Sequence, residues 1–107
     1  MRGLIVKREH LELIRHGTKT QTRRLHKHPL RAGERTILKK TFYETWTPEI
    51  IIEIIDAYEQ QLRDMTEHDA RREGFKSLQE FKAMWPRYTR MAWRPNMVVM
   101  VYEFRLL

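Results

Sequence analysis

The pattern of apolar and polar positions divides the chain into short segments separated by glycine and proline. Residues 3–7 form an apolar run that ends in a lysine, which predicts a first strand. Residues 8–17 place apolar side chains at positions 11, 13 and 14 and close on Gly17, which predicts a short amphipathic helix with a glycine stop. Pro29 and Gly33 mark a loop before residues 35–46, whose threonine, aromatic and β-branched side chains favour a strand or hairpin.

Residues 49–62 fit two structures. Apolar residues at positions 50, 51, 54, 55, 58 and 62 have helical spacing, and the sequence Thr47-Pro48-Glu49 resembles a helix start. Isoleucine also alternates at positions 50, 52 and 54, and five isoleucines within residues 50–55 favour a strand. Periodicity alone slightly favours the helix.

The C-terminal part of the chain carries two helix-start signals. Thr66 with Asp69 resembles a capping box, and Gly74 supplies a stop, which predicts a helix between them. Ser77 with Glu80 predicts a second helix, which we expect to end at Pro86. Residues 87–96 then form a loop and residues 97–107 a closing strand. This order predicts a small α+β fold, and the length of 107 residues predicts a single domain, 1–107.

Composition excludes several classes of protein. The longest apolar cluster, residues 50–55, is far too short to cross a bilayer and contains Glu53. The first ten residues lack the features of a secretory signal, and the absence of cysteine excludes a disulfide framework and a thiolate metal site. We therefore expect a cytoplasmic protein with no membrane partner, and we assume a monomer.

Charge is distributed unevenly along the chain, whose formal net charge is +7. Residues 1–40 hold 12 basic and 3 acidic side chains, a net +9, whereas residues 41–80 hold 4 basic and 10 acidic side chains, a net −6. Residues 81–107 are again basic, with 5 basic side chains and 1 acidic side chain. If the two ends meet in the fold, they form one positive surface of the kind that binds phosphate backbones.

Three motifs carry a resemblance to a known family. Residues 17–24, GTKTQTRR, contain the pattern G-x-K-x-x-T-x-R through Gly17, Lys19, Thr22 and Arg24. LRAGERTIL, residues 30–38, matches a step into a strand, with Glu34 where the pattern has aspartate, and residues 67–85 match a helix pair. In these motifs and their order the sequence resembles the ASCH family of the PUA-like superfamily.

The resemblance implies a PUA-like β-barrel of about five or six strands with three short helices packed around it. It also implies that residues 49–62 form a barrel strand, against the count of helical spacings, and that a cleft lies near residues 17–24. ASCH domains are thought to bind RNA or nucleosides. Some small bacterial members are amidohydrolases that act on N(4)-acetylcytidine with a lysine, a threonine and a glutamate, which fall here on Lys19, Thr22 and Glu73.

The chemistry of these three residues is coherent. A threonine hydroxyl needs a neighbouring base to take its proton, and a lysine can be that base only if its pKa is lowered. Burial lowers it, and so does the positive charge of Arg23 and Arg24 next to Lys19. Glu73 could orient the amine or move the proton. On a regular strand, however, Lys19 and Thr22 would face opposite sides, so their convergence requires a turn or an irregular loop.

Each of these residues also has an ordinary structural interpretation. Lys19 could be a solvated lysine, Thr22 could cap a turn, and Glu73 could simply end a helix before Gly74. Arg24 fits contact with a polar ligand, a phosphate or a buried carboxylate better than it fits proton transfer, because a guanidinium stays protonated.

Residues 88–95 form a second candidate binding segment. Tyr88, Arg90, Trp93 and Arg94 interleave aromatic and cationic side chains, the mixture that stacks on bases and neutralises phosphates. Packing of Trp93 in the core is an equally good interpretation. His26 and His28 alternate like a metal-ligand pair, but no third ligand lies near them in the sequence. We therefore expect no metal and no cofactor.

The sequence thus predicts a domain that binds a nucleoside or an RNA nucleotide in a basic cleft. The predicted catalytic residues are Lys19, Thr22 and Glu73, and the predicted binding residues are Gly17, Arg23, Arg24, Tyr88, Arg90, Trp93 and Arg94. Hydrolysis of the acetyl group of N(4)-acetylcytidine is the sharper hypothesis. The alternative is an RNA-binding module without catalysis, and a ribonuclease is the less favoured third reading.

Overall fold

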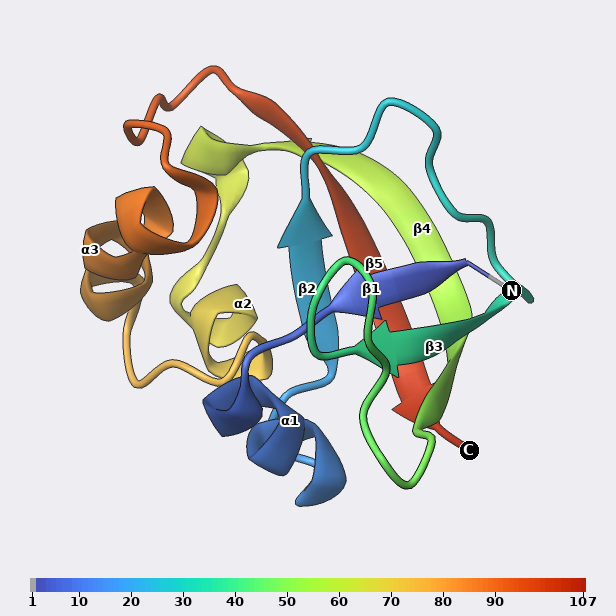
Figure 1. The fold of residues 1–107 in the computed structure, drawn as a ribbon. Helices are drawn as coiled ribbons and strands as arrows, with labels where there is room; N and C mark the ends of the chain where they lie inside the picture. The colour runs from blue at the N-terminus through green and yellow to red at the C-terminus, as the bar shows by residue number, and fades with distance from the viewer. Residues whose placement is uncertain (1) are drawn as a thin grey trace.

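Two long antiparallel strands, β4 (Ile51–Gln61) and β5 (Val98–Leu106), form the centre of the fold in this computed structural model, which describes residues 2–107. They pair along almost their whole length. The register shifts between Ile54 and Asp56, so an irregularity of the β-bulge kind bends the pair near its middle. Figure 1 shows that the two strands cross the molecule side by side and curve in the same direction.

Three shorter strands complete a mixed sheet with the order β1-β3-β4-β5-β2, in which β1 and β3 are parallel and the other pairs antiparallel. Their bounds are β1 (Gly3–Ile5), β2 (Gln21–Arg24) and β3 (Arg35–Lys39). The predicted α+β fold is therefore confirmed, with five strands in the sheet.

The predicted closed barrel is wrong. Strands β1 and β2 are the two edges of the sheet, and no ladder joins them within the described residues (Figure 1). Ile5 of β1 and Thr22 of β2 line the same cavity. The two edges are therefore separated by a space rather than joined by hydrogen bonds.

The isoleucine run lies in β4 from Ile51 onward and not in a helix. Ile50, Ile52 and Ile54 are buried on one face, whereas the carboxylate of Glu53 accepts hydrogen bonds from the guanidinium of Arg105 on β5. The strand implied by the family resemblance is thus confirmed, and the helical interpretation of the spacing is wrong. The alternation was the informative signal, because β-branched side chains pack well on a pleated surface.

Three α-helices gather on one side of the sheet (Figure 1), and both predicted caps are present. Thr66 and Asp69 exchange side-chain and backbone hydrogen bonds in a capping box, and the Ser77 hydroxyl accepts from the Glu80 N–H. The helices are α1 (Arg8–Arg15), α2 (Glu67–Arg72) and α3 (Leu78–Thr89), and a single 3₁₀ turn, η1 (Leu62–Asp64), follows β4.

Helix α3 does not end at Pro86, contrary to the prediction, and the first three residues of the expected loop are helical. The Thr89 hydroxyl donates to the Trp85 carbonyl at 2.7 Å, and the Arg90 N–H donates to the Pro86 carbonyl at 2.8 Å. A proline lacks only its own backbone N–H, so the carbonyl groups of Trp85 and Pro86 can still accept hydrogen bonds. These two bonds hold the last turn, and Arg90 then leaves the helix in the left-handed conformation with φ of 60°.

The core consists of two clusters that share β5. Tyr102 and Phe104 pack in the first cluster, together with β1, α1 and β3, whereas Val99 and Val101 pack in the second, with α2 and α3. Successive side chains of a strand point to opposite faces, so β5 serves both. The first cluster includes Leu4, Val6, Leu11, Ile14, Leu38, Ile52 and Ile54, and the second includes Leu62, Ala70, Phe75, Phe81 and Trp85.

Pairing of β2 with β5 brings the two basic ends of the chain together. Arg23 lies opposite Val101, and Arg24 lies opposite Met100.

No helix in residues 2–107 combines the length and the apolar character needed to cross a membrane.

A pair of glycine substitutions tests how closely α1 packs against the end of α2. Gly74 has φ of +94°, and a Cβ there would lie 2.7 Å from Cδ1 of Leu13, whereas Gly17 has φ of +76° and nothing within 4 Å of its Cβ position. Left-handed strain costs about 1 kcal/mol at either site. Crowding adds about 1 kcal/mol at Gly74 alone, because the Leu13 side chain has to leave its present position to make room for the added methyl group.

We therefore expect Gly17→Ala to lower the free energy of unfolding by about 1 kcal/mol and Gly74→Ala by about 2 kcal/mol. Urea denaturation of the two variants measures both values. Equal losses would contradict the close packing of Leu13 on Gly74.

Candidate functional site

The segment that follows α1 is tied to two helices before β2 begins. The N–H groups of Thr18 and Lys19 both donate to the carbonyl of Leu13, at 2.9 and 3.1 Å. The N–H of Thr20 donates to the carbonyl of Arg72, at the end of α2, at 2.8 Å. Backbone bonds therefore fix the position of Lys19 between α1 and α2.

This arrangement removes the geometric objection to Lys19 and Thr22 acting together. The strand β2 begins only at Gln21, so Lys19 precedes it and does not follow its alternation of faces. Both side chains are buried, and both line the same cavity.

Within β2 the side chains alternate between two polar environments. On one face, Nε of Arg24 donates to Oγ1 of Thr22 at 3.0 Å. On the other face, Nη1 of Arg23 donates to Oε1 of Gln21 at 3.1 Å. Since the Thr22 oxygen accepts from a guanidinium, its own hydrogen is available to a different acceptor.

Glu73, the residue at the end of α2, joins the loop and the strand through its carboxylate. Oε1 accepts from Nζ of Lys19 at 2.9 Å, and Oε2 accepts from Nη1 of Arg23 at 3.1 Å. Nζ of Lys19 also donates to the Glu73 carbonyl at 3.1 Å. Glu73 is 3% exposed, Lys19 4% and Arg23 5%, so all three charges are withdrawn from water. We refer to Lys19, Arg23 and Glu73 as the buried charge network.

Asp69 adds a second carboxylate at the edge of this network. Its Oδ2 lies 3.4 Å from Nη2 of Arg23, and Nε of Arg23 donates to Oε1 of Gln60 at 2.9 Å. Two cations therefore face two carboxylates, which is the condition under which buried charges are tolerated.

Burial lowers the pKa of Lys19 below its ordinary value, because removal from water disfavours the ammonium form. The Glu73 carboxylate opposes this change, and the charges of Arg24 and Arg23 add to it. The net direction is the one that a lysine base requires. Burial also lowers the pKa of Arg24, but a guanidinium remains protonated, so Arg24 stays a cation beside Thr22.

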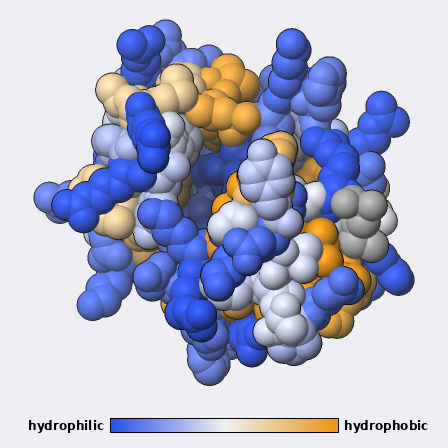
Figure 2. Space-filling view, viewed as in Figure 1, coloured by the Kyte–Doolittle hydropathy of each residue, from blue (hydrophilic) through white to orange (hydrophobic). Residues whose placement is uncertain are grey.

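A cavity of about 340 Å³ opens beside these residues, at the point where the two core clusters meet. Figure 2 shows a hollow on this face of the molecule with hydrophilic side chains at its bottom. The polar part of the lining includes Lys19, Thr22, Arg24 and Glu73, and the apolar part includes Val6, Phe75, Phe81 and Trp85. Apolar walls with a few convergent polar groups are typical of small-molecule sites.

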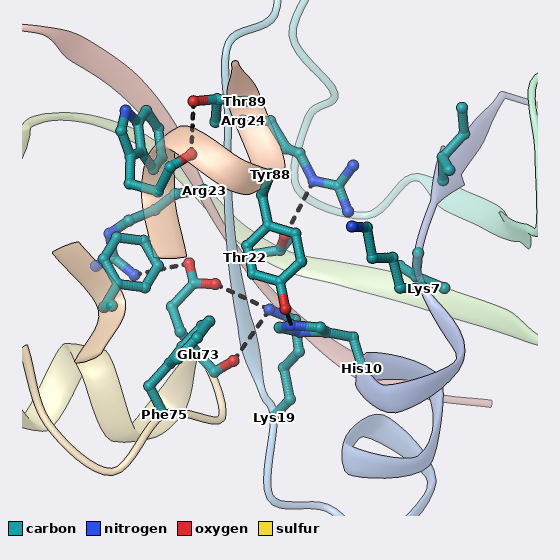
Figure 3. Close-up of a pocket in the computed structure, with 14 residues that line it drawn as sticks. Lys7, His10, Lys19, Thr22, Arg23, Arg24, Glu73, Phe75, Tyr88 and Thr89 are labelled. Atoms are coloured by element: carbon teal, nitrogen blue, oxygen red, sulfur yellow. Dashed lines mark hydrogen bonds and ion pairs between the residues drawn. The ribbon is translucent and has the colours of Figure 1, made fainter. Parts of the chain in front are cut away.

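His10 and Tyr88 meet across this cavity. Figure 3 shows His10 on α1 and Tyr88 on α3 pointing toward each other, close to Lys19 and Thr22. Nε2 of His10 lies 3.2 Å from the Tyr88 hydroxyl, and the rings are perpendicular with centroids 5.1 Å apart. Burial, helped by the charges of Lys19 and Arg24 and opposed by that of Glu73, lowers the pKa of His10 to about 4. His10 is therefore a neutral imidazole at neutral pH.

Sequence analysis did not identify His10 and Lys7, which both line the cavity. A single histidine on a short amphipathic helix carries no motif and no periodicity. A lysine at the end of an apolar strand is usually interpreted as a solvent-exposed residue. Only the packing of α1 against α3 turns them toward the same space as Thr22.

The structure divides the predicted site residues into two groups. Lys19, Thr22, Arg23, Arg24, Glu73 and Tyr88 all line the cavity. Gly17, Arg90, Trp93 and Arg94 lie away from its lining, and their binding roles stay predictions. Gly17 ends α1, Arg90 ends α3, and Trp93 packs edge-to-face against Phe81 and Trp85 in the second cluster.

His26 has a partner other than a metal. Its Nδ1 lies 2.7 Å from the hydroxyl of Tyr102, a buried residue, and that hydroxyl also accepts from the N–H of Leu30 at 3.0 Å. Over residues 2–107 no three histidine, cysteine, aspartate or glutamate side chains gather in a way that could hold a metal ion.

Comparison with solved structures identifies the fold. The ASCH domain from Lactobacillus crispatus superimposes with a TM-score of 0.77 at 18% identity, over 98% of this chain and 79% of that one. The hypothetical protein PH0355 gives a TM-score of 0.76 at 16% identity over the whole of both chains. A mutant of ZmASCH from Zymomonas mobilis gives 0.65 at 13% identity, over 96% and 67% of the two chains.

No protein-family model and no curated protein matches the sequence. The fold is nevertheless that of ASCH domains, as the sequence motifs predicted.

Substitutions in the buried charge network test whether the Glu73 carboxylate is the shared partner of both cations. We expect Glu73→Leu to lower the free energy of unfolding by about 3–5 kcal/mol, because it leaves Lys19 and Arg23 buried without their common carboxylate. We expect Lys19→Met to cost only about 1 kcal/mol, since Arg23 still pairs with Glu73. Urea denaturation of both variants gives the comparison, and a loss in Lys19→Met as large as in Glu73→Leu would contradict it.

Proposed function

We propose that the cavity binds a nucleoside or an RNA nucleotide and that its reaction is hydrolysis of an acyl amide on a modified cytidine, N(4)-acetylcytidine. One observation carries the proposal: Lys19, Thr22 and Glu73 come from a loop, a strand and a helix end, yet all three line one cavity. The cavity has aromatic walls, and aromatic side chains are the usual stacking partners of exposed bases. An acyl group on such a base would lie near the polar bottom.

Thr22 is suited to the role of nucleophile. Its Oγ1 accepts a hydrogen bond from Nε of Arg24, which leaves the hydroxyl hydrogen free for transfer to a base. The same guanidinium stabilises negative charge on the oxygen as the proton leaves. An unperturbed threonine on a surface strand has neither advantage.

Lys19 serves as the base in this proposal. Its neutral amine takes the Thr22 hydroxyl proton while Oγ1 forms a bond to the acetyl carbonyl carbon. The C–N bond to the cytosine then breaks, and the ammonium of Lys19 returns the proton to the departing nitrogen, which leaves as cytidine. Water hydrolyses the acetyl ester on Thr22, releases acetate and restores the hydroxyl. In the net reaction, one amide and one water molecule give one amine and one carboxylic acid.

Glu73 positions Lys19 and exchanges a proton with it. The ammonium donates to both a carboxylate oxygen and the carbonyl of Glu73, which fixes the direction of the lysine side chain. The carboxylate is also the nearest acceptor for the proton that Lys19 must lose before it can act as a base. Its interaction with Arg23 holds that carboxylate in place.

Binding of RNA without catalysis is the second candidate function. The excess of basic residues in positions 1–40 favours a polyanion over an uncharged nucleoside. In this reading Arg24 and Lys7 in the cavity lining would hold phosphate. Affinity for RNA would then fall steeply with salt, because phosphate contacts release counterions.

Hydrolysis of free N(4)-acetylcytidine by the purified protein tests the enzymatic proposal. We expect release of cytidine by the parent protein and loss of at least about 100-fold in turnover for both Thr22→Val and Lys19→Met, since each removes a group that acts in the transition state. Thr20→Val is the matched control, because Thr20 is an exposed threonine on the same segment outside the cavity. Chromatography of the products gives the measurement.

Turnover by Thr22→Val at the rate of the parent would exclude the nucleophile. No release of cytidine by the parent at high enzyme concentration would exclude the reaction and leave RNA binding as the function of the cavity.

A further inference from the structure

The loop between β3 and β4 presents two aromatic side chains to solvent. Phe42 is 70% exposed and Tyr43 is 90% exposed, although large aromatic side chains are usually at least half covered. The two rings are perpendicular, with centroids 5.0 Å apart. Exposed aromatic side chains that adjoin each other at a loop tip mark a contact surface rather than a random surface position.

Backbone bonds within the loop hold these rings outward. The N–H groups of Lys40 and Thr41 donate to the carbonyl of Glu44, at 2.8 and 3.2 Å. The Thr41 hydroxyl oxygen accepts from the N–H groups of Tyr43 and Glu44, at 3.3 and 3.1 Å. Lys39 and Thr45 form a bridge across the base of the loop. The backbone of the loop is therefore preorganised, which lowers the entropy cost of ordering the loop when a ligand binds.

Both ends of the loop are anchored to a wall of the cavity. The N–H of Val6 donates to the Lys39 carbonyl at 2.9 Å, and Nε1 of Trp46 donates to the Val6 carbonyl at 3.3 Å. Val6 itself lines the cavity, as do its neighbours Ile5 and Lys7. Figure 1 shows the loop, in green, beside β1. The aromatic tip thus extends from the same segment that forms one side of the candidate site.

Cationic side chains surround this anchor. Nζ of Lys39 lies over the Phe42 ring, 5.1 Å from its centroid, and donates to the Phe42 carbonyl. The guanidinium of Arg8 and the amine of Lys40 lie over the Trp46 ring, at 5.1 and 5.6 Å. Aromatic rings interleaved with lysine and arginine are typical of surfaces that stack bases and neutralise phosphates of single-stranded nucleic acids.

We propose that residues 39–46, the aromatic loop, are a stacking platform for single-stranded RNA, which binds a base next to the nucleotide in the cavity. An uncharged apolar partner would explain the exposed rings but not the cations arranged around the loop, which favour an anionic partner with stacking groups. The proposal rests on the proposed function in one respect, that the cavity holds a nucleotide. It extends that function by naming the ligand as a nucleotide within a strand rather than a free nucleoside.

A comparison of one RNA and one nucleoside tests this proposal. The RNA is a short, fluorescently labelled single strand that contains one N(4)-acetylcytidine, and its affinity is measured by anisotropy. The nucleoside is free N(4)-acetylcytidine, and its turnover is measured by chromatography. We expect the double variant Phe42→Leu/Tyr43→Leu to bind the RNA about tenfold more weakly, which is the loss of one stacked base. Turnover of the nucleoside should not change.

Leucine is chosen because it keeps an apolar side chain and removes the aromatic face. Tyr43→Trp should keep the RNA affinity of the parent, since tryptophan also stacks. Ile55→Ala is the matched control, because Ile55 is an exposed apolar residue of β4 outside the loop and outside the cavity lining. It should leave both measurements unchanged.

Three results would overturn the proposal: RNA affinity of the double leucine variant equal to that of the parent, no measurable RNA binding by the parent, or loop-dependent binding to anionic lipid vesicles in place of RNA. The outcomes separate the two proposals. Loop-dependent RNA affinity without hydrolysis of the nucleoside would support the platform and reject the reaction. Hydrolysis of the nucleoside with loop-independent RNA affinity would support the reaction and reject the platform.

Discussion

The rest of the site depends on the carboxylate of Glu73, which is shared by two buried cations. A buried charge without a partner is costly, and this carboxylate accepts from both Lys19 and Arg23, while Asp69 lies beside Arg23 as a second anion. Through these two hydrogen bonds, Glu73 at the end of α2 holds the loop after α1 and the strand β2 in position. Gly74 follows Glu73 directly, and its lack of a side chain lets Leu13 of α1 pack against this corner. The two core clusters meet around the network, and the cavity opens where they meet.

The same network sets the chemistry of the cavity. Burial lowers the pKa of Lys19, and Glu73 limits the decrease, so the amine is held by a hydrogen-bond acceptor and yet is easier to deprotonate than a lysine in water. On the opposite face of β2, Arg24 donates to Thr22 and leaves the hydroxyl hydrogen free. The two faces of β2 therefore differ, since Arg23 binds the Glu73 carboxylate on one face while Thr22 and Arg24 place a hydroxyl and a positive charge on the other. His10, a neutral imidazole, and Tyr88 complete the cavity without adding charge.

Local signals explain why part of this structure could be predicted from the sequence. The caps at Thr66 and Ser77 rest on side chains three residues apart, and both are present as predicted. The motif of residues 17–24 indicated the fold and singled out Lys19 and Thr22 as candidates, and the family resemblance added Glu73 as the glutamate at a helix end. Features decided by contacts between distant elements were harder. Residues 51–61 are a strand because they pair with β5 and β3. The last turn of α3 forms because Thr89 and Arg90 supply hydrogen bonds around Pro86. The sheet stays open, with β1 and β2 on either side of a cavity. His10 enters the site only through packing, which no local pattern records.

An NMR titration of the Lys19 amine tests the central claim most directly, because it measures the effect of the buried charge network on the proposed base. The account predicts a pKa below the ordinary lysine value of 10.5 in the parent protein. It predicts a lower pKa still in Glu73→Gln, where the hydrogen-bonding shape remains but the negative charge that favours the ammonium is gone. A pKa at or above 10.5 in the parent, or a rise in Glu73→Gln, would contradict the account.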